Sequence, residues 1–339
     1  MAVAEHRVTI SDIAAASGVS VASVSRSLRG LPGVGTQTRE RIVAVADEFG
    51  YEPHPQASRL ASGRNSTVGL AAPLFGTWFV LRAMAGIYAV LDEAGYDLLI
   101  TVMTTPADRK RFLKEARSFC RRVDGVILID TMASAEGDSA DAYFNRPVVA
   151  IGERLAGAVS IAVDNRLAAR RATEYLIGLG HERIGVITAP EMAEMSMSSA
   201  SQRRLGYEDA LRNAGLDVDP DLAVPGHGSI AGGVAAMSRL LAVPAPPTGV
   251  FCMSDEMAFG ALHAARGAGW AVPEALSVVG FDDHDFAQAT GLTTMRQSVN
   301  EMGMTAARTV LALIDNSDSI GEITWDVPLV TRHTTAPRR

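Results

Sequence analysis

The stretch that most constrains the fold of this 339-residue chain is its first well-patterned segment, Val8 to Leu28. Its apolar residues recur at helical spacing, Gly18 interrupts them, and a second apolar run follows Ser20. This pattern predicts two short helices joined by a tight turn, with Ser20 capping the second helix. The outward face of that helix is small, polar and cationic, with Ala22, Ser23, Ser25, Arg26 and Arg29. Such a face suits a DNA major groove, although two amphipathic core helices remain an alternative.

A third helical run is expected over residues 36–49, with Ile42, Val45, Ala46 and Phe49 on one face. It would close a small core over the first two helices. The residues at 50–53 stop it, and residues 54–65 form a polar segment that is too short to fold alone.

These segments resemble the lactose/galactose-repressor (LacI/GalR) family of bacterial transcription regulators. The resemblance starts with VTISDIAAASGVSVASVSRSL, continues through TRERIVAVADEFGYEPHPQASRLASGR, and runs more loosely to the C-terminus. It implies that Val21, Ala22 and Arg26 read bases and that a hinge helix folds on DNA. Leu60 would then enter the minor groove, or alternatively the segment is a passive tether. The DNA-contacting residues expected from the pattern and the resemblance are Thr9, Ser11, Ser20, Val21, Ala22, Ser23, Ser25, Arg26, Arg29, Ala57 and Leu60.

The hinge departs from the family's usual pattern, because His54 and Pro55 stand where asparagine and a non-proline residue are common. Proline is tolerated in a first helical turn, since its missing N–H would be unpaired there.

The charge distribution separates a DNA-binding head from the rest of the chain. The net charge is −7 in total; up to Arg64 there are seven cations and six acidic residues, so that segment is +1 and the remainder is −7 − 1 = −8. Only the weakly basic head is a plausible phosphate binder, and a charge this small would need two copies for tight binding.

Length and composition indicate a chain of more than one domain, and we expect it in the cytoplasm. A hydrophobic share of 47% is ample for a sizeable core, and no apolar run approaches the ~20 residues that span a bilayer. The start, MAVAEHRVTI, has no secretory pattern. Cys120 and Cys252 are far apart and are expected to be core thiols in a reducing compartment.

From Thr67 onward, short apolar runs alternate with helical segments. The expected strands are 68–72, 97–103, 125–130, 147–152, 160–163, 183–188, 249–253, 277–280 and 322–330; the expected helices are 80–94, 107–122, 165–179, 201–214, 255–268 and 302–314. Continuous apolar strands between helices predict α/β architecture, with parallel sheets covered on both faces. Because the alternation restarts after residue 164, we expect two lobes, which the resemblance identifies with the fold of periplasmic sugar-binding proteins.

The expected domains are a helix-turn-helix head at 1–52, a hinge at 53–65, and an effector-binding and dimerisation body at 66–339. Within the body, the first lobe would hold about 66–164 plus 298–318, and the second about 165–297 plus 319–333.

Ligands of such folds lie beyond the carboxyl ends of strands, in the crevice between lobes. The candidate effector-binding residues on that rule and by resemblance are Phe75, Trp78, Asp130, Asp164, Arg203, Ser254 and Asp282. Trp78 could stack on a ligand or simply pack a lobe, and Asp130 and Asp164 could bind a polyol or cap helices. Arg203 fits the family's Arg-x-x-Gly pattern, but an inter-lobe salt bridge with Asp282 is the alternative. Gly228 stands where many relatives carry a sugar-stacking aromatic, so another ring does the stacking or the effector is not a simple pyranose.

Other chemistry is not indicated. The run Asp282 to Asp285 includes a histidine, but consecutive side chains point in different directions, so no metal site is expected. No cofactor fingerprint, nucleophile elbow or His-Glu-x-x-His motif is present, which disfavours an enzyme. A transport-type solute-binding protein, the remaining rival, would need a secretory signal and would lack the head.

The sequence therefore predicts a cytoplasmic, sequence-specific transcription regulator, expected to be a repressor. It would bind palindromic double-stranded operator DNA as a homodimer, without a membrane or a cofactor. A small, carbohydrate-like effector between the lobes would control its operator affinity.

Overall fold

The computed structural model describes residues 8–28, 30–51, 64–72, 77–130, 139–189, 198–317 and 321–338. The chain divides into two compact units, a head at residues 1–66 and a body at residues 67–339, which are treated separately below. Most of the predicted hinge, including Ala57 and Leu60, lies outside the described residues, as do Arg29 and Phe75.

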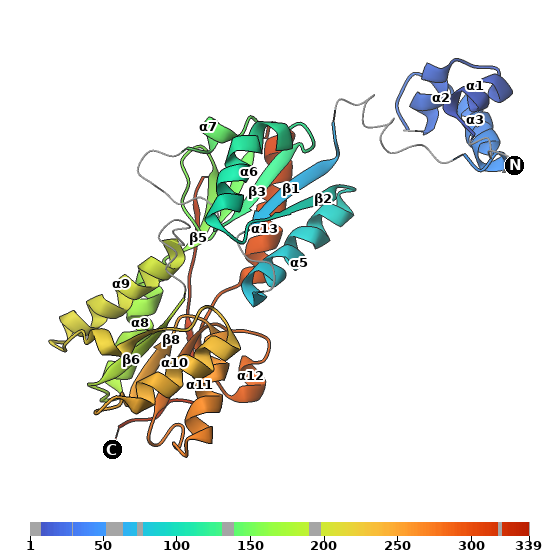
Figure 1. Ribbon diagram of the computed structural model, residues 1–339. Coiled ribbons are helices and arrows are strands. Elements are labelled where there is room, and N and C mark those ends of the chain that lie inside the picture. Colours follow the sequence, from blue (N-terminus) through green and yellow to red (C-terminus); the bar gives the residue numbers. More distant parts are fainter. Residues whose placement is uncertain are drawn as a thin grey trace, which may run out of the picture. The chain divides into compact units, whose positions relative to one another are not determined.

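The described part of the head contains three short helices, α1 (Ile10–Ser17), α2 (Val21–Leu28) and α3 (Thr36–Glu48) (Figure 1). Ile13, Val24 and Ile42, one from each helix, are fully buried and form its core. The predicted turn and cap are confirmed: Gly18 is left-handed at φ 67°, and the Ser23 N–H donates to Ser20 Oγ over 3.1 Å. The expectation that Phe49 joins the core is wrong, because α3 ends at Glu48 and Phe49 is 44% exposed.

The first lobe of the body is a six-stranded parallel sheet in the order β11-β5-β4-β3-β1-β2. Its strands are β1 (Thr67–Ala72), β2 (Asp97–Val102), β3 (Gly125–Ile129), β4 (Val148–Ile151), β5 (Val159–Val163) and β11 (Ile323–Trp325). Its helices are α5 (Trp78–Glu93), α6 (Pro106–Phe119), α7 (Ala140–Tyr143) and α13 (Val299–Ile314).

Alternation along these strands explains why both faces of the first sheet are covered. Leu70 and Ile127 belong to the cluster packed by α5 and α13, whereas their neighbours Ala71 and Val126 belong to the cluster packed by α6 and α7. Strands buried on both faces read as continuous apolar runs, which is why these runs were recognisable in the sequence.

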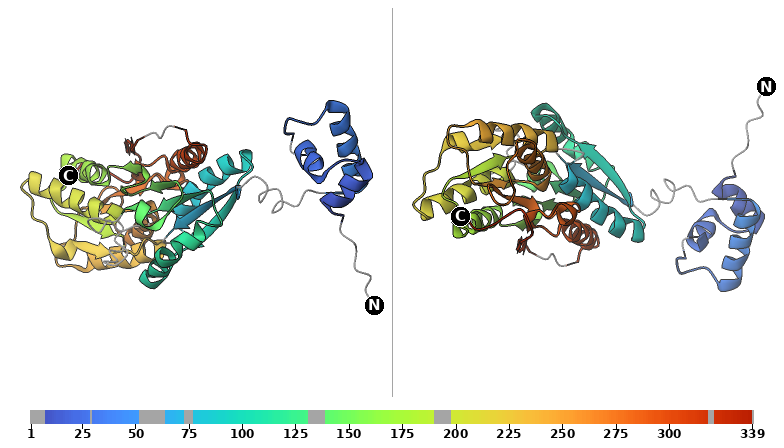
Figure 2. Two further views of the ribbon diagram at one scale, coloured as in Figure 1. Left: turned by 90° about the horizontal axis from the view of Figure 1, so that it is seen from above. Right: turned by 90° about the horizontal axis from the view of Figure 1, so that it is seen from below.

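The second lobe is a six-stranded sheet in the order β12-β10-β9-β8-β6-β7, parallel except where β12 pairs with β10. Its strands are β6 (Ile184–Thr188), β7 (Ala223–Pro225), β8 (Gly249–Cys252), β9 (Ser277–Asp282), β10 (Thr293–Arg296) and β12 (Leu329–Val330). Its helices are α8 (Asn165–Gly178), α9 (Ser198–Asn213), α10 (Ile230–Ala242), α11 (Asp255–Gly267) and α12 (Ala287–Thr290), with a 3₁₀ turn at Pro220–Leu222. Helices α8 and α9 pack together, as do α10 and α11, and Figure 2 shows helices on both sides of the strands.

The chain passes between the lobes after β5, after β10 and after β11. The expected single strand at 322–330 is in fact two strands, because β11 pairs with β5 in the first sheet and β12 with β10 in the second. Assigning all of 319–333 to the second lobe was therefore wrong for β11. Pro328, which lies between the two strands, cannot donate a ladder hydrogen bond. Among the described residues, no helix is both long and apolar enough to span a membrane.

Candidate functional site: a cleft between the lobes

Between the lobes of the body lies a cleft of about 870 Å³, part of it open to solvent. Most of its polar groups stand at the carboxyl ends of parallel strands, where sheets of this kind place their ligands. Its lining is apolar at Phe79, Val80, Ile129, Val163, Ala189, Ala200 and Met253, and polar at Thr77, Asp130, Asn165, Ser199, Arg203, Ser254, Glu256, Asp282 and Gln297, with Gly152 and Gly228 completing it. Of the seven candidate effector residues, Asp130, Arg203, Ser254 and Asp282 are in this lining.

Arg203 is the cation at the centre of the cleft. Its Nε donates to Asn165 Oδ1 over 2.8 Å, its Nη1 donates to the Met253 carbonyl over 2.5 Å, and its guanidinium carbon lies 3.6 Å from the centre of the Phe281 ring. These contacts hold the guanidinium plane, and among the described residues Nη2 forms no hydrogen bond. Within the described residues no ion pair joins Arg203 to Asp282, and both belong to the second lobe, so the alternative of an inter-lobe salt bridge does not apply.

The Arg-x-x-Gly pattern has a packing explanation. A Cβ at Gly206 would lie 2.1 Å from the Arg166 carbonyl oxygen, so only glycine lets α9 approach α8 this closely. That approach brings Arg203 within reach of Asn165, the first residue of α8.

Asp282 ends β9 in a left-handed backbone conformation, with φ 122°. Gln297, which follows β10, donates to its Oδ1 over 2.7 Å, and its side chain is almost fully buried. Burial raises the pKa of Asp282 to about 6, although Arg203 and the Gln297 hydrogen bond oppose the rise. A buried carboxylate with one oxygen not bonded to Gln297 is a strong acceptor for a ligand hydroxyl.

Asp130 contributes a second carboxyl, from the end of β3 in the first lobe, also with a left-handed φ of 45°. Its Oδ2 accepts a hydrogen bond from Ser199 Oγ on α9 over 2.7 Å, so this contact joins the two lobes. Its Oδ1 is buried without a hydrogen-bond partner among the described residues. Burial raises the pKa of Asp130 to about 6, opposed by Ser199 and Arg203. An unpaired buried acceptor costs free energy that a donating ligand would recover.

Two other candidates, Trp78 and Asp164, do not line the cleft as expected, and a third lies outside the described residues. Trp78 is absent from the lining, although its neighbours Thr77 and Phe79 are in it; its ring lies against His284, 5.0 Å between centroids. Asp164 caps α8, accepting from the Leu167 N–H over 2.9 Å, and borders a separate hollow. The starting point of α5 explains why Trp78 is not in the lining. The helix begins at Trp78, two residues earlier than expected, so the consecutive side chains of its first turn point in different directions. Phe75 lies outside the described residues.

The cleft also contains polar residues that were not predicted. Gln297 follows β10, a strand that the sequence reading missed, and would have been found by the same carboxyl-end rule. Glu256 is on the first turn of α11, where burial raises the pKa of its carboxyl group. Ser254, which was predicted, both lines the cleft and caps α11 by accepting from the Met257 N–H over 3.3 Å.

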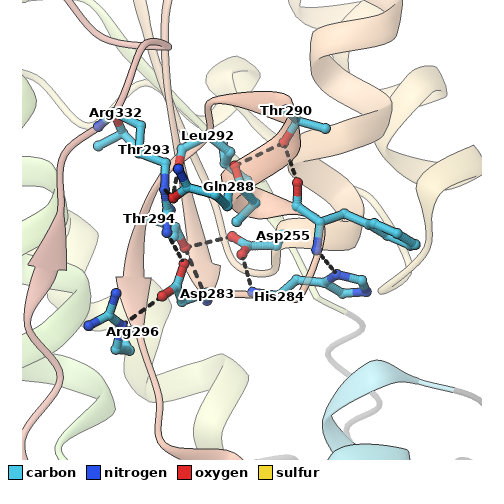
Figure 3. A network of polar contacts seen from close by, with 12 residues as sticks. Asp255, Asp283, His284, Gln288, Thr290, Leu292, Thr293, Thr294, Arg296 and Arg332 are labelled. Carbon is cyan, nitrogen blue, oxygen red and sulfur yellow. Dashed lines mark hydrogen bonds and ion pairs between the residues drawn. The ribbon is translucent and has the colours of Figure 1, made fainter.

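The acidic run after β9 disperses its side chains. Asp282 faces the cleft, Asp283 binds Arg296 and Arg332 over 2.6 Å each, and Asp285 accepts from the Trp78 Nε1 over 3.1 Å. Figure 3 shows Asp283 and His284 within this network. No group of three or more metal-binding side chains converges in the part of the chain that the structure describes.

In the head, the predicted base-reading residues share the outward side of α2. Val21, Ala22 and Arg26 are exposed, whereas Val24 and Ser27 of the same helix are buried. At the start of α1, the Asp12 carboxylate accepts from the Thr9 N–H over 2.8 Å and from its hydroxyl over 2.7 Å, and Ser11 is exposed. Ser20 is exposed, and its Oγ lies 2.9 Å from Ser23 Oγ, while Ser25 is partly buried.

A helix-turn-helix head joined to a two-lobed α/β body defines a class of DNA-binding proteins. Comparison with known proteins specifies the family. Residues 9–54 match the model of bacterial regulatory proteins of the lacI family, and residues 173–335 match a periplasmic binding protein-like domain. The chain is 33% identical over 316 residues to the HTH-type transcriptional repressor CytR of Escherichia coli K12, covering 92% of this chain and 90% of that protein.

Solved structures agree. The lac repressor dimer bound to operator and the anti-inducer ONPF superimposes with a TM-score of 0.84 at 26% identity, covering 97% of this chain and 99% of that one. The transcriptional regulator CelR in complex with cellobiose gives a TM-score of 0.66 at 28% identity, covering 97% of this chain and all of that one. The chain belongs to the lacI family of bacterial regulatory proteins and is a DNA-binding transcriptional repressor.

Proposed function

We propose that this repressor binds a small, uncharged, hydroxyl-rich effector in the cleft between its lobes and that the bound effector sets its affinity for a palindromic operator. The proposal rests on three charged residues that line one cleft. Asp130 comes from the end of β3, Arg203 from α9, and Asp282 from the end of β9. Asp130 Oδ1 has no partner, and a ligand hydroxyl would supply the missing donor. Arg203 Nη2 can donate to an adjacent ligand oxygen.

The apolar part of the lining favours a ligand with one nonpolar face. Phe79 supplies a ring in the lining, while Gly228 supplies none at the position where many relatives carry an aromatic residue. Carbohydrates and related compounds combine apolar C–H faces with hydroxyl rims. The cellobiose in the CelR complex supports a carbohydrate-like effector for this chain.

Control of DNA binding would work by population shift. Asp130 belongs to the first lobe and Arg203 to the second, so a ligand held by both favours one arrangement of the lobes. In a homodimer, that arrangement would change the spacing of two heads and hence their fit to two half-sites.

An exposed apolar face on the first lobe supports a homodimer. Leu81 and Tyr88 on α5, with Ile100 and Val102 on the edge strand β2, are 41%, 56%, 39% and 37% exposed. An edge strand and helix with this much apolar surface suit a partner, and a second copy is the partner seen in the lac repressor dimer. We place the protein in the cytoplasm, where its DNA would be.

The effector can be identified by mass spectrometry of small molecules released from the natively purified protein. The compound found is then titrated by calorimetry into the wild type, Arg203→Ala and Arg212→Ala, the last removing an exposed arginine from the same helix. We expect loss of binding in Arg203→Ala alone. Equal binding to all three proteins would exclude the cleft as its site.

A further inference from the structure

A set of contacts beside the cleft joins the two lobes directly. Trp78, at the start of α5 in the first lobe, donates from Nε1 to Asp285 Oδ2 over 3.1 Å. Its ring lies on the His284 imidazole with 5.0 Å between centroids and 32° between planes, and Arg82 Nη2 lies 4.0 Å from Asp285 Oδ1. We propose that Trp78, Arg82, His284 and Asp285 form an inter-lobe latch that favours closure of the cleft before any ligand binds.

The second-lobe half of the latch is held rigidly by its own lobe. Asp255 is fully buried and accepts from the His284 N–H over 2.8 Å and from the Thr294 hydroxyl over 2.6 Å (Figure 3). Gly280 makes room for this carboxylate, since a Cβ there would lie 2.1 Å from Asp255 Oδ1. The loop that presents His284 and Asp285 is therefore preorganised, and closure needs only the approach of α5.

The rings around His284 complete the socket for Trp78. Phe259 meets the imidazole edge-on at 5.3 Å, and Phe286 stacks on it at 5.2 Å with 24° between planes. The Phe286 N–H donates to His284 Nδ1 over 3.0 Å, which fixes the orientation of the imidazole ring. The Trp78 side chain thus contacts a prebuilt aromatic surface and one carboxylate acceptor of the second lobe.

The latch is continuous with the cleft on both lobes. The loop that carries His284 follows Asp282, the last residue of β9, which lines the cleft. On the first lobe, Thr77 and Phe79, the residues on either side of Trp78 in the chain, also line the cleft. The Trp78 N–H also approaches the Glu256 carboxylate of the second lobe, 3.4 Å from Oε2. A ligand touching these lining residues would act on the same lobe arrangement as the latch; this coupling rests on the proposed effector function.

The magnitude of the contacts makes the latch reversible. Asp285 and Arg82 have side chains that are 59% and 44% exposed, so their ion pair contributes little. One hydrogen bond and one ring contact are enough to shift a two-state equilibrium by about two- to tenfold, not to lock it. A latch of this strength still allows a bound ligand to shift the equilibrium between open and closed states.

The test measures the distance between lobes in the full-length protein without any ligand. Dyes are attached after Lys114→Cys on α6 and Arg266→Cys on α11, because both positions are exposed and the native Cys120 and Cys252 are buried. Single-molecule energy transfer then gives the ratio of open to closed molecules. We expect Trp78→Phe and Asp285→Ala each to raise that ratio by about two- to tenfold.

The matched control is Arg212→Ala, which removes the ion pair between the exposed Arg212 and Glu208 within α9 and should leave the ratio unchanged. In the double variant Trp78→Phe with Asp285→Ala, the ratio of open to closed molecules should be close to that of either single variant, because both substitutions remove the same hydrogen bond. If Asp285→Ala folds poorly by circular dichroism, the test rests on Trp78→Phe, which keeps an aromatic ring and removes only the indole N–H that donates to Asp285.

Unchanged energy transfer in folded Asp285→Ala and Trp78→Phe would overturn the latch, and it would do so without bearing on DNA or effector binding. A second readout separates a positioning role from ligand contact. Once an effector is known, Trp78→Phe should weaken a series of its analogues by one common factor. If the order of the analogue affinities in Trp78→Phe differed from that in the wild type, Trp78 would contact the ligand, and the proposal would be contradicted.

Discussion

Asp130 shows how a single residue of the cleft links stability to pH. Its pKa in the folded protein is raised to about 6 from 3.8, so the folded state takes up a proton at a higher pH than the unfolded state. Stability from this group is therefore fully present below the unfolded pKa and is lost as pH rises toward and past about 6. The free energy of unfolding of the wild type should gain about 1 kcal/mol from Asp130 between pH 7 and pH 5.

Asp130→Asn should lack that gain, while its side-chain oxygen still accepts from Ser199. Urea unfolding of the wild type and the variant at both pH values measures the difference directly, because other titrating groups cancel. Parallel pH profiles for the two proteins would show that Asp130 titrates normally.

Arg26 is the residue on which sequence discrimination by the head is expected to depend. It projects from the exposed side of α2, in its last turn, beside the exposed Ala22. If it reaches a guanine edge, Arg26→Ala should weaken operator binding by about 1–3 kcal/mol and relax preference at one position per half-site. Binding to a library of operator variants at one fixed salt concentration provides the measurement. A uniform loss across all sequences would mean a phosphate contact instead.

At the scale of elements, the α8–α9 pair positions the cleft arginine. Gly206→Ala would force the helices apart, because the new Cβ would meet the Arg166 carbonyl at 2.1 Å. We expect about 1–3 kcal/mol of destabilisation from overpacking, together with weaker effector binding as Arg203 moves.

Gly178→Ala is the matched control, since Gly178 ends α8 and nothing lies within 4 Å of its Cβ position. Thermal unfolding should show it to be at least as stable as the wild type, because alanine favours helix over glycine. Equal stability of both variants would mean that α8 and α9 tolerate a wider spacing.

The elements were predictable where one physical signal dominated. Apolar runs such as Gly125–Ile129 are buried on both faces and were read correctly, and the glycine-broken helices of the head follow from Gly18 and Ser20. β10 was missed because its residues, Thr293–Arg296, are three polar residues and one methionine, and only tertiary packing buries the first three. That omission also hid Gln297.

Cleft residues were predictable from the sequence where the strand that precedes them was also predictable. Asp282 and Asp130 followed recognised strands, and both line the cleft. Trp78 could not be placed, because its direction depends on where α5 begins and on a loop more than two hundred residues away, as its bond to Asp285 shows. Local pattern supplies positions along the chain, whereas side-chain partners come from the tertiary structure.

For the whole molecule, the dimer prediction depends on the exposed face of α5 and β2. Replacing Tyr88 by Glu should place a charge in the apolar surface that includes Ile100 and should favour the monomer. Sedimentation at micromolar concentration checks this, with Lys114→Glu on the exposed side of α6 as the control. A Tyr88→Glu variant that sediments like the wild type would move the interface elsewhere.

We propose that effector binding in the cleft and operator binding by the head are coupled in one molecule. The most direct test is the affinity of the co-purified effector for the full-length protein, measured free and saturated with operator DNA selected from random sequence. We predict that the two dissociation constants differ by at least about fivefold, and that effector changes operator affinity by the same factor. The coupling would be contradicted if operator left the effector affinity unchanged and effector left the operator affinity unchanged, for a ligand whose binding Arg203→Ala abolishes.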